Sequence, residues 1–315
     1  VALTWPAATD PSGISGYDVY RGTTLAGSTT GTSFTDSAVV RGSVYFYTVK
    51  AKDGAGNASV ASPTSSVKVL APYDAHLTRA PYLTDLVGNH VAINFATDRS
   101  ATTATVVYGA VDGTGACTPS TTVATNRVSI QVGPVAQYQW TAQVDLPAAG
   151  TYCYRVQLAG TDLLASNPSP RFTTQTAFGS TAPYTFAVFG DWGQVDASGN
   201  NPDQANLLAQ MAASGAKFAV SVGDNGYPNG NQVDYGDLQQ TATSAIFGPK
   251  GWTVPGATLP LFTAVGNHGV SGVTHTDITT WTQARAVATS GGRYQNDSYC
   301  CVNGSNPSNY GSEWY

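Results

Sequence analysis

Charge is the scarcest property of this chain. Of its 315 residues only 10% are Asp, Glu, Lys or Arg, well below the roughly one quarter usual in soluble proteins. Lys and Arg together number 14 and the net charge is -5, so the clustered cations that nucleic-acid phosphates need are missing and no nucleic-acid partner is expected. The polar surface must come from Thr, Ser, Asn, Gln and Gly. That composition favours a secreted or cell-surface protein rich in β-sheet.

Long apolar runs are absent as well. The sequence contains no stretch of 18 or more apolar residues, which predicts that no segment of it spans a membrane as a helix. Hydrophobic residues nevertheless make up 42% of the chain, enough for the packed cores of two or three domains. The sequence opens at Val1, in the middle of an apparent strand. We therefore interpret it as a processed or partly covered protein, and the missing signal peptide says nothing about localisation.

Cysteine is limited to four residues, and none forms a CxxC pair, so a zinc–thiolate site is not expected. Cys117 and Cys153 fall in one predicted β-domain. In an extracellular setting they favour a disulfide, and the alternative is two buried free thiols. Cys300 and Cys301 are neighbours in the chain, and they bond either to each other or to residues beyond Tyr315.

Short alternating strands separated by turns fill residues 1–71. One strand covers residues 16–22 and another covers residues 44–51. This spacing predicts a β-sandwich, whose first strand we place before Val1. Trp5, the strand GYDVYRG and the strand-turn YFYTVKAKDGAGNAS resemble a bacterial fibronectin type III module.

A second β-sandwich is predicted for residues 72–180. Alternating runs at 91–95, 104–108, 138–146 and 151–158 indicate half-buried strands. The segments RAPYLTD, VAINFATD, VVYG and TYCYRV resemble the N-terminal fibronectin-like domain of purple acid phosphatases.

The hydrophobic period changes in residues 181–315. Continuous apolar runs at 184–189, 217–222 and 259–265 predict strands that are buried on both faces. Residues 202–213 have helical spacing. Strand, helix and strand in this order predict a parallel α/β layer.

Each of these three strands ends in a small polar motif: GDWG, GDNGY and GNHG, in chain order. Because the carboxyl ends of parallel strands meet at one edge of a sheet, we expect the polar side chains of these motifs to converge. The residues concerned are Asp191, Asp224, Tyr227, Asn267 and His268. Their donors suit iron, zinc or manganese, and two such ions supply both a nucleophile and charge stabilisation for phosphoester hydrolysis. Trp192, at the variable position of its motif, would line the pocket.

The order GDxG, GDxxY, GNH resembles the purple acid phosphatase subset of the calcineurin-like metallophosphoesterases. The resemblance implies that Asp191 and Tyr227 bind a first metal, that Asp224 bridges two metals and that Asn267 binds the second. His268 would be the catalytic residue, contacting the substrate phosphate and assisting protonation of the leaving group. The implied cofactor is a dinuclear centre of Fe(III) with Zn, Fe or Mn, and the implied substrate is a phosphorylated small molecule.

The chain departs from that family at two points. Gly269 stands where the family has an acidic residue, and none of His76, His90 and His275 matches the three later histidine ligands. We expect His76 and His90 to be structural or exposed, and His275 to lie in a surface loop.

The sequence thus predicts a multidomain chain: two all-β fibronectin III-like sandwiches (1–71 and 72–180), then the N-terminal part of an α/β metallophosphoesterase domain of α/β/β/α type (181–315). One functional hypothesis is a secreted metal-dependent phosphatase that hydrolyses phosphate monoesters with a metal-bridging hydroxide. The alternative is an extracellular structural or adhesive protein with an incomplete or inactive phosphatase domain. A third hypothesis is a carbohydrate-binding accessory module at residues 1–70, with cell-surface or glycan contact through the fibronectin modules.

Overall fold

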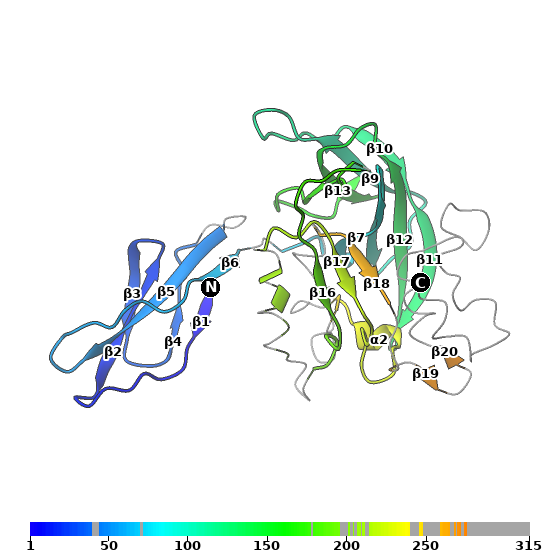
Figure 1. Ribbon diagram of the computed structural model, residues 1–315. Helices are drawn as coiled ribbons and strands as arrows, with labels where there is room; N and C mark the ends of the chain where they lie inside the picture. The colour runs from blue at the N-terminus through cyan, green and yellow to red at the C-terminus, as the bar shows by residue number, and fades with distance from the viewer. Residues whose placement is uncertain are drawn as a thin grey trace. The chain divides into compact units, whose positions relative to one another are not determined.

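The chain forms two compact units. The computed structural model describes residues 1–39, 44–69, 72–177 and 179–195, and shorter stretches from there to residue 275. The first unit is residues 1–73 with 165–168, and the second is residues 74–164 with 169–315 (Figure 1). Among the described residues, no helix is both long and apolar enough to cross a membrane.

The first unit is a small β-sandwich. Its larger sheet has the strand order β3-β2-β5-β6, and its smaller sheet pairs β1 with β4. The strands are β1 (Ala2–Thr4), β2 (Ile14–Arg21), β3 (Thr24–Thr29), β4 (Ser33–Thr35), β5 (Val44–Asp53) and β6 (Ser65–Lys68). Tyr17, Val19 and Tyr47 are buried between the sheets, and Trp5 packs edge-on against Tyr17 with ring centroids 5.5 Å apart.

A second sandwich begins the second unit. One sheet has the order β11-β12-β8-β7, and the other has the order β10-β9-β13-β14 with β15 paired to β13 (Figure 1). The strands are β7 (Leu77–Val87), β8 (His90–Thr97), β9 (Ala104–Ala110), β10 (Thr121–Ala124), β11 (Asn126–Val132), β12 (Val135–Asp145), β13 (Thr151–Leu158), β14 (Thr161–Asp162) and β15 (Arg171–Thr173). Cys117 and Cys153 form a disulfide, so the predicted crosslink is confirmed and the free-thiol alternative is wrong.

The prediction of half-buried strands is wrong for β8, every residue of which is buried. The cause lies outside the sandwich. Residues from the third segment of the chain cover this sheet: Tyr82 of β7 stacks on Phe247 with ring centroids 4.6 Å apart, and Thr78 accepts a backbone hydrogen bond of 2.6 Å from Leu238. A strand that is covered on both faces cannot show the alternation of a half-exposed strand.

Three short parallel strands follow the sandwich. They are β16 (Ala187–Phe189), β17 (Ala219–Ser221) and β18 (Leu261–Thr263), adjacent in that order. The predicted parallel arrangement is confirmed. An α/β phosphoesterase domain is not shown: beside this sheet, the elements with defined bounds in the third segment are α2 (Gln232–Tyr235), β19 (Val270–Ser271) and β20 (Thr274–His275). Residues 204, 207, 208, 210 and 211, within the predicted helix, are helical.

The parallel sheet is buried on one face only, so the prediction of burial on both faces is wrong. Phe189, Ala219 and Leu261 point into a core that includes Met211 and Tyr235. On the other face, Val188 is 57% exposed and Val222 is 60% exposed. A continuous apolar run does not distinguish the two cases, because an apolar side chain can occupy the exposed face of a strand.

Candidate functional site

The ends of β16 and β17 bring two carboxylates to one edge of the parallel sheet. The Asp191 amide donates a hydrogen bond of 3.2 Å to the Gly223 carbonyl, which joins the two loops. The Tyr227 hydroxyl donates to Asp191 Oδ1 at 3.0 Å. Asp224 Oδ1 accepts from the His268 amide at 2.9 Å. Asp191, Asp224, Tyr227 and His268 therefore lie together, whereas Asn267 lies outside the described residues.

Both aspartates have a left-handed backbone, with φ of 52° at Asp191 and 51° at Asp224. This conformation is uncommon outside glycine, although Asp tolerates it better than most residues. Each such residue stores on the order of 1 kcal/mol of strain, and strained residues gather at functional sites. The two φ values turn the chain sharply after each strand, which places both carboxylates at the sheet edge.

Asn225 fastens this edge together. Its Oδ1 accepts from Trp192 Nε1 at 2.8 Å and from the Ser221 hydroxyl, and its Nδ2 donates to the Ala264 carbonyl at 2.7 Å. The side chain is fully buried, and it links the loops that follow β16, β17 and β18. Sequence reasoning missed this residue, because an Asn before a Gly is typical of an ordinary turn.

Trp192 is a core residue, not the pocket wall that its motif position indicated. It is 3% exposed and packs edge-on against Phe189 with ring centroids 4.9 Å apart. The following Gly193 lies against Asn225, such that a Cβ on Gly193 would come within 1.8 Å of the Asn225 carbonyl oxygen. No side chain larger than hydrogen fits there.

The phenol of Tyr227 is held in its neutral form. Burial, the hydrogen bond to Asp191 and the negative charges of Asp224 and Asp191 raise the pKa of Tyr227 well above its ordinary value. A cation at this edge would have to displace the phenolic proton before Tyr227 became an anionic ligand. His268 Nδ1 lies 2.9 Å from the Pro228 carbonyl, which only accepts, so Nδ1 carries a proton and Nε2 is the ring nitrogen suited to binding or proton transfer.

The described residues supply only some of the ligands that a metal ion would need. Two carboxylates and a phenol are hard oxygen donors of the kind that iron and manganese accept. Within the ranges that the structure describes, however, no three His, Cys, Asp or Glu side chains group closely enough to hold a metal ion. The dinuclear centre implied by the motifs is therefore a prediction that depends on Asn267 and other residues outside those ranges.

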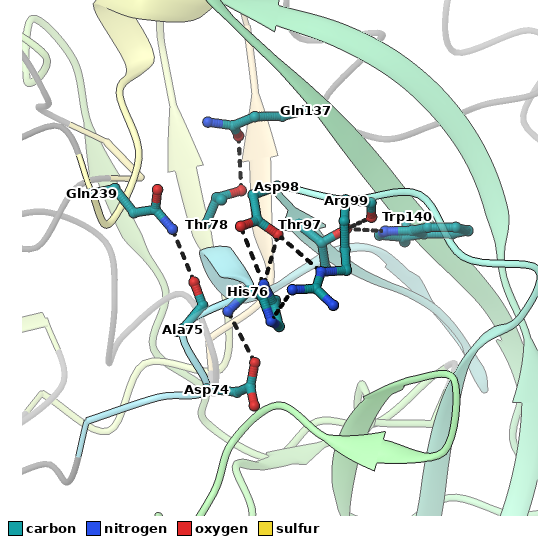
Figure 2. Close-up of polar contacts among 10 residues, drawn as sticks. All are labelled: Asp74, Ala75, His76, Thr78, Thr97, Asp98, Arg99, Gln137, Trp140 and Gln239. Atoms are coloured by element: carbon teal, nitrogen blue, oxygen red, sulfur yellow. Dashed lines mark hydrogen bonds and ion pairs between the residues drawn. The ribbon is translucent and has the colours of Figure 1, made fainter.

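His76 and His90 belong to the second sandwich. His76 Nδ1 lies 3.0 and 3.2 Å from the two carboxylate oxygens of Asp98, and Figure 2 shows Arg99 on its other ring nitrogen. Because a guanidinium only donates, His76 Nε2 accepts and the ring holds its proton on Nδ1. His90 is buried, 2.8 Å from both Asp145 and Gln143. Both histidines form hydrogen bonds that hold β-strands or their loops in place, which agrees with the expectation that they are structural or exposed. The backbone of His275 lies in β20, so the loop assignment is wrong.

The curated relatives match short segments of this chain. No family model matches the chain. The chain is 54% identical over 74 residues to exoglucanase B of Cellulomonas fimi, and 52% identical over 71 residues to chitinase A1 of Niallia circulans. These matches cover 23% and 22% of this chain but 7% and 10% of those relatives. The chain therefore spans a tenth or less of the length of these two relatives. The segments that match are fibronectin type III modules of those proteins.

Solved structures give weaker likenesses. A purple acid phosphatase from yellow lupin matches with a TM-score of 0.44 and 16% identity, over 73% of this chain and 42% of that one. Fibronectin(III)-like modules of Clostridium thermocellum CbhA match with a TM-score of 0.17 and 19% identity, over 57% of this chain and 87% of that one.

These comparisons correct the purple acid phosphatase assignment. Identities of about 50% point to fibronectin type III modules of exoglucanases and chitinases, whereas the likeness to a phosphatase is too low to carry an assignment. The relatives give no support to an acid phosphatase or to metal binding, and no metal site appears among the described residues, whereas the predicted disulfide is present. The physical reason for the error is the brevity of the motifs: Gly-Asp and Gly-Asn pairs also supply the left-handed turns that end ordinary strands.

Proposed function

We propose that this chain belongs to an extracellular multidomain protein, in which the first unit is an accessory module that contacts a polysaccharide. The observation that carries the proposal is the identity of more than half of the aligned residues to segments of an exoglucanase and a chitinase. The low charge and the disulfide also support it, since disulfides persist in oxidising compartments. The proposal joins the structural or adhesive alternative to the third hypothesis, a carbohydrate-binding accessory module at residues 1–70.

A depletion assay tests the proposal. The full chain is mixed with insoluble chitin, with microcrystalline cellulose or with cross-linked dextran, and the protein left in the supernatant is measured. We expect chitin or cellulose to deplete the chain and dextran to leave it in solution. If chitin and cellulose leave as much protein in the supernatant as dextran does, the proposed polysaccharide contact is overturned.

A second candidate is metal-dependent phosphatase activity at the edge of the parallel sheet. The observation in its favour is that Asp191, Asp224 and Tyr227 meet there with two strained backbones. A bound cation would act as a Lewis acid toward a phosphoryl oxygen. Asp191 and Asp224 would hold it, Tyr227 would release its proton on joining them, and His268 would face the phosphate.

Isothermal titration calorimetry tests whether this edge of the parallel sheet binds a metal ion. Titration with Mn²⁺, Zn²⁺ and Fe³⁺ should give saturable binding that Asp224→Asn weakens at least about tenfold, equivalent to about 1.4 kcal/mol. Hydrolysis of p-nitrophenyl phosphate should appear only with the bound cation. An absence of binding by the wild-type chain would remove the candidate.

A further inference from the structure

The outer face of the larger sheet in the first unit carries a strip of apolar side chains. Tyr20 of β2 lies opposite Leu25 of β3 and opposite Thr48 of β5. Phe46 is two residues before Thr48, so it points to the same face and is the diagonal neighbour of Tyr20. Three adjacent strands thus place Leu25, Tyr20 and Phe46 in one line across the sheet.

These side chains are not used by the core. Leu25 is 51% exposed and Phe46 is 53% exposed, whereas Tyr17, Val19 and Tyr47, on the opposite face of the same strands, are buried. The fold gains little from exposed apolar side chains, and contiguous ones mark binding surfaces. A line of side chains on a flat sheet suits an extended ligand more than a compact one that needs a pocket.

The charges beside the strip exclude a polyanionic partner. Lys52 pairs with Asp18 at 2.7 Å, so this pair is neutral. Lys50 remains, and its ammonium lies 5.4 Å from the centroid of the Tyr20 ring. One cation is too few for a polyanion. It does supply hydrogen-bond donors for carbonyl or hydroxyl oxygens next to the aromatic surface.

We propose that the strip formed by Tyr20, Leu25, Phe46 and Lys50 is the surface through which the first unit lies on chitin. Chitin is neutral and extended: its sugar rings offer C–H faces to Tyr20 and Phe46, and its acetamido carbonyls accept from Lys50. The inference rests on the proposed polysaccharide contact and adds the binding surface and the polymer.

Depletion of the full chain by insoluble chitin tests the strip with matched variants. Leu25→Ser/Phe46→Ser removes its two most exposed members, and Val60→Ser removes an apolar side chain that is 90% exposed elsewhere in the first unit. We expect the double variant to lose at least about tenfold in its partition onto chitin, or about 1.4 kcal/mol. Val60→Ser should bind as the wild type does. Phe46→Tyr keeps an exposed ring and should bind within about twofold, which tests the strip should the double variant fail to fold.

The possible outcomes distinguish a failure of the proposed binding strip from a failure of polysaccharide contact itself. Wild-type binding with no loss in the double variant would overturn the strip and leave polysaccharide contact standing. Equal partition of the wild type onto cellulose and chitin would overturn the choice of chitin. If neither polymer retains the wild type, the proposed function itself fails, and the strip fails with it.

Discussion

Single buried polar side chains hold loops together in both units. Asp36 accepts from the Tyr47 hydroxyl at 2.7 Å, from Arg21 at 2.9 Å and from the Ala38 amide at 2.9 Å. Asn225 does the same for the edge of the parallel sheet. Their partners lie up to 39 residues away in sequence, so neither role is visible in local composition. Only the fold shows that these two residues are more than turn formers.

Tyr47 should make stability depend on pH in the alkaline range. Burial and the hydrogen bond to Asp36 raise the pKa of Tyr47 from 10.0 to about 12. The unfolded chain loses the phenolic proton first, so the free energy of unfolding should fall as pH rises from 10 toward 12. Tyr47→Phe should remove this fall and cost about 1.5–3 kcal/mol at pH 8.

Urea unfolding at a series of pH values from 8 to 11 measures both effects of Tyr47→Phe. The comparison is with the wild type at each pH, because other tyrosines contribute equally to both proteins. The same alkaline slope in the two proteins would show that Tyr47 is not responsible.

Gly193 should tolerate no side chain. A Cβ would lie 1.8 Å from the Asn225 carbonyl oxygen, so Gly193→Ala must displace one of the two loops at a cost of about 1–3 kcal/mol or more. Gly113→Ala is the matched control, since a Cβ there meets nothing within 4 Å. Thermal unfolding should show a lower midpoint for Gly193→Ala alone, and equal midpoints would contradict the close approach.

Strand positions follow from the sequence better than strand environments do. The run at 151–158 predicts β13, and the three apolar runs after residue 181 predict β16, β17 and β18 in parallel. The burial of β8 and the exposure of Val188 were predicted wrongly. Whether a strand face is buried depends on which other segments of the chain pack against it. The hydrophobic periodicity of the strand carries no information about those segments.

The crosslink between Cys117 and Cys153 should contribute more than any single hydrogen bond. It joins β13 to the loop before β10 and encloses a separation of 36 residues, for which loss of unfolded-chain entropy predicts about 3–4 kcal/mol. The double change Cys117→Ala/Cys153→Ala should lower the free energy of unfolding of the second unit by about that amount. Hydrogen exchange by mass spectrometry resolves the units, and peptides of the first unit serve as the internal control.

The second sandwich and the parallel sheet belong to one compact unit. Contacts between residues far apart in sequence join them. Arg79 of β7 donates to Gln232 Oε1 at 2.7 Å across 153 residues of sequence. Its guanidinium lies 4.5 Å from the centroid of the Phe247 ring. Contacts this distant in sequence leave no periodic signal.

Arg79 should couple these two parts of the second unit. It is fully buried near Asp237, and its Nε and Nη1 have no hydrogen-bond partner among the described residues. Arg79→Ala removes the charge-assisted hydrogen bond to Gln232 and should cost about 1.5–3 kcal/mol. Calorimetry measures the change, and a midpoint for Arg79→Ala equal to the wild type would contradict the coupling.

The left-handed aspartates have a consequence for how this chain responds to mutation. Glycine adopts φ near 50° freely, whereas alanine there costs about 1–2 kcal/mol. Asp191→Gly should therefore be more stable than Asp191→Ala by about that amount in thermal unfolding, although both lack the carboxylate. Equal midpoints would mean that the backbone is not strained. Glycine at this position would relieve the backbone but would forgo the hydrogen bond that Asp191 accepts from Tyr227, so the loop after β16 trades backbone strain for a side-chain contact between two loops.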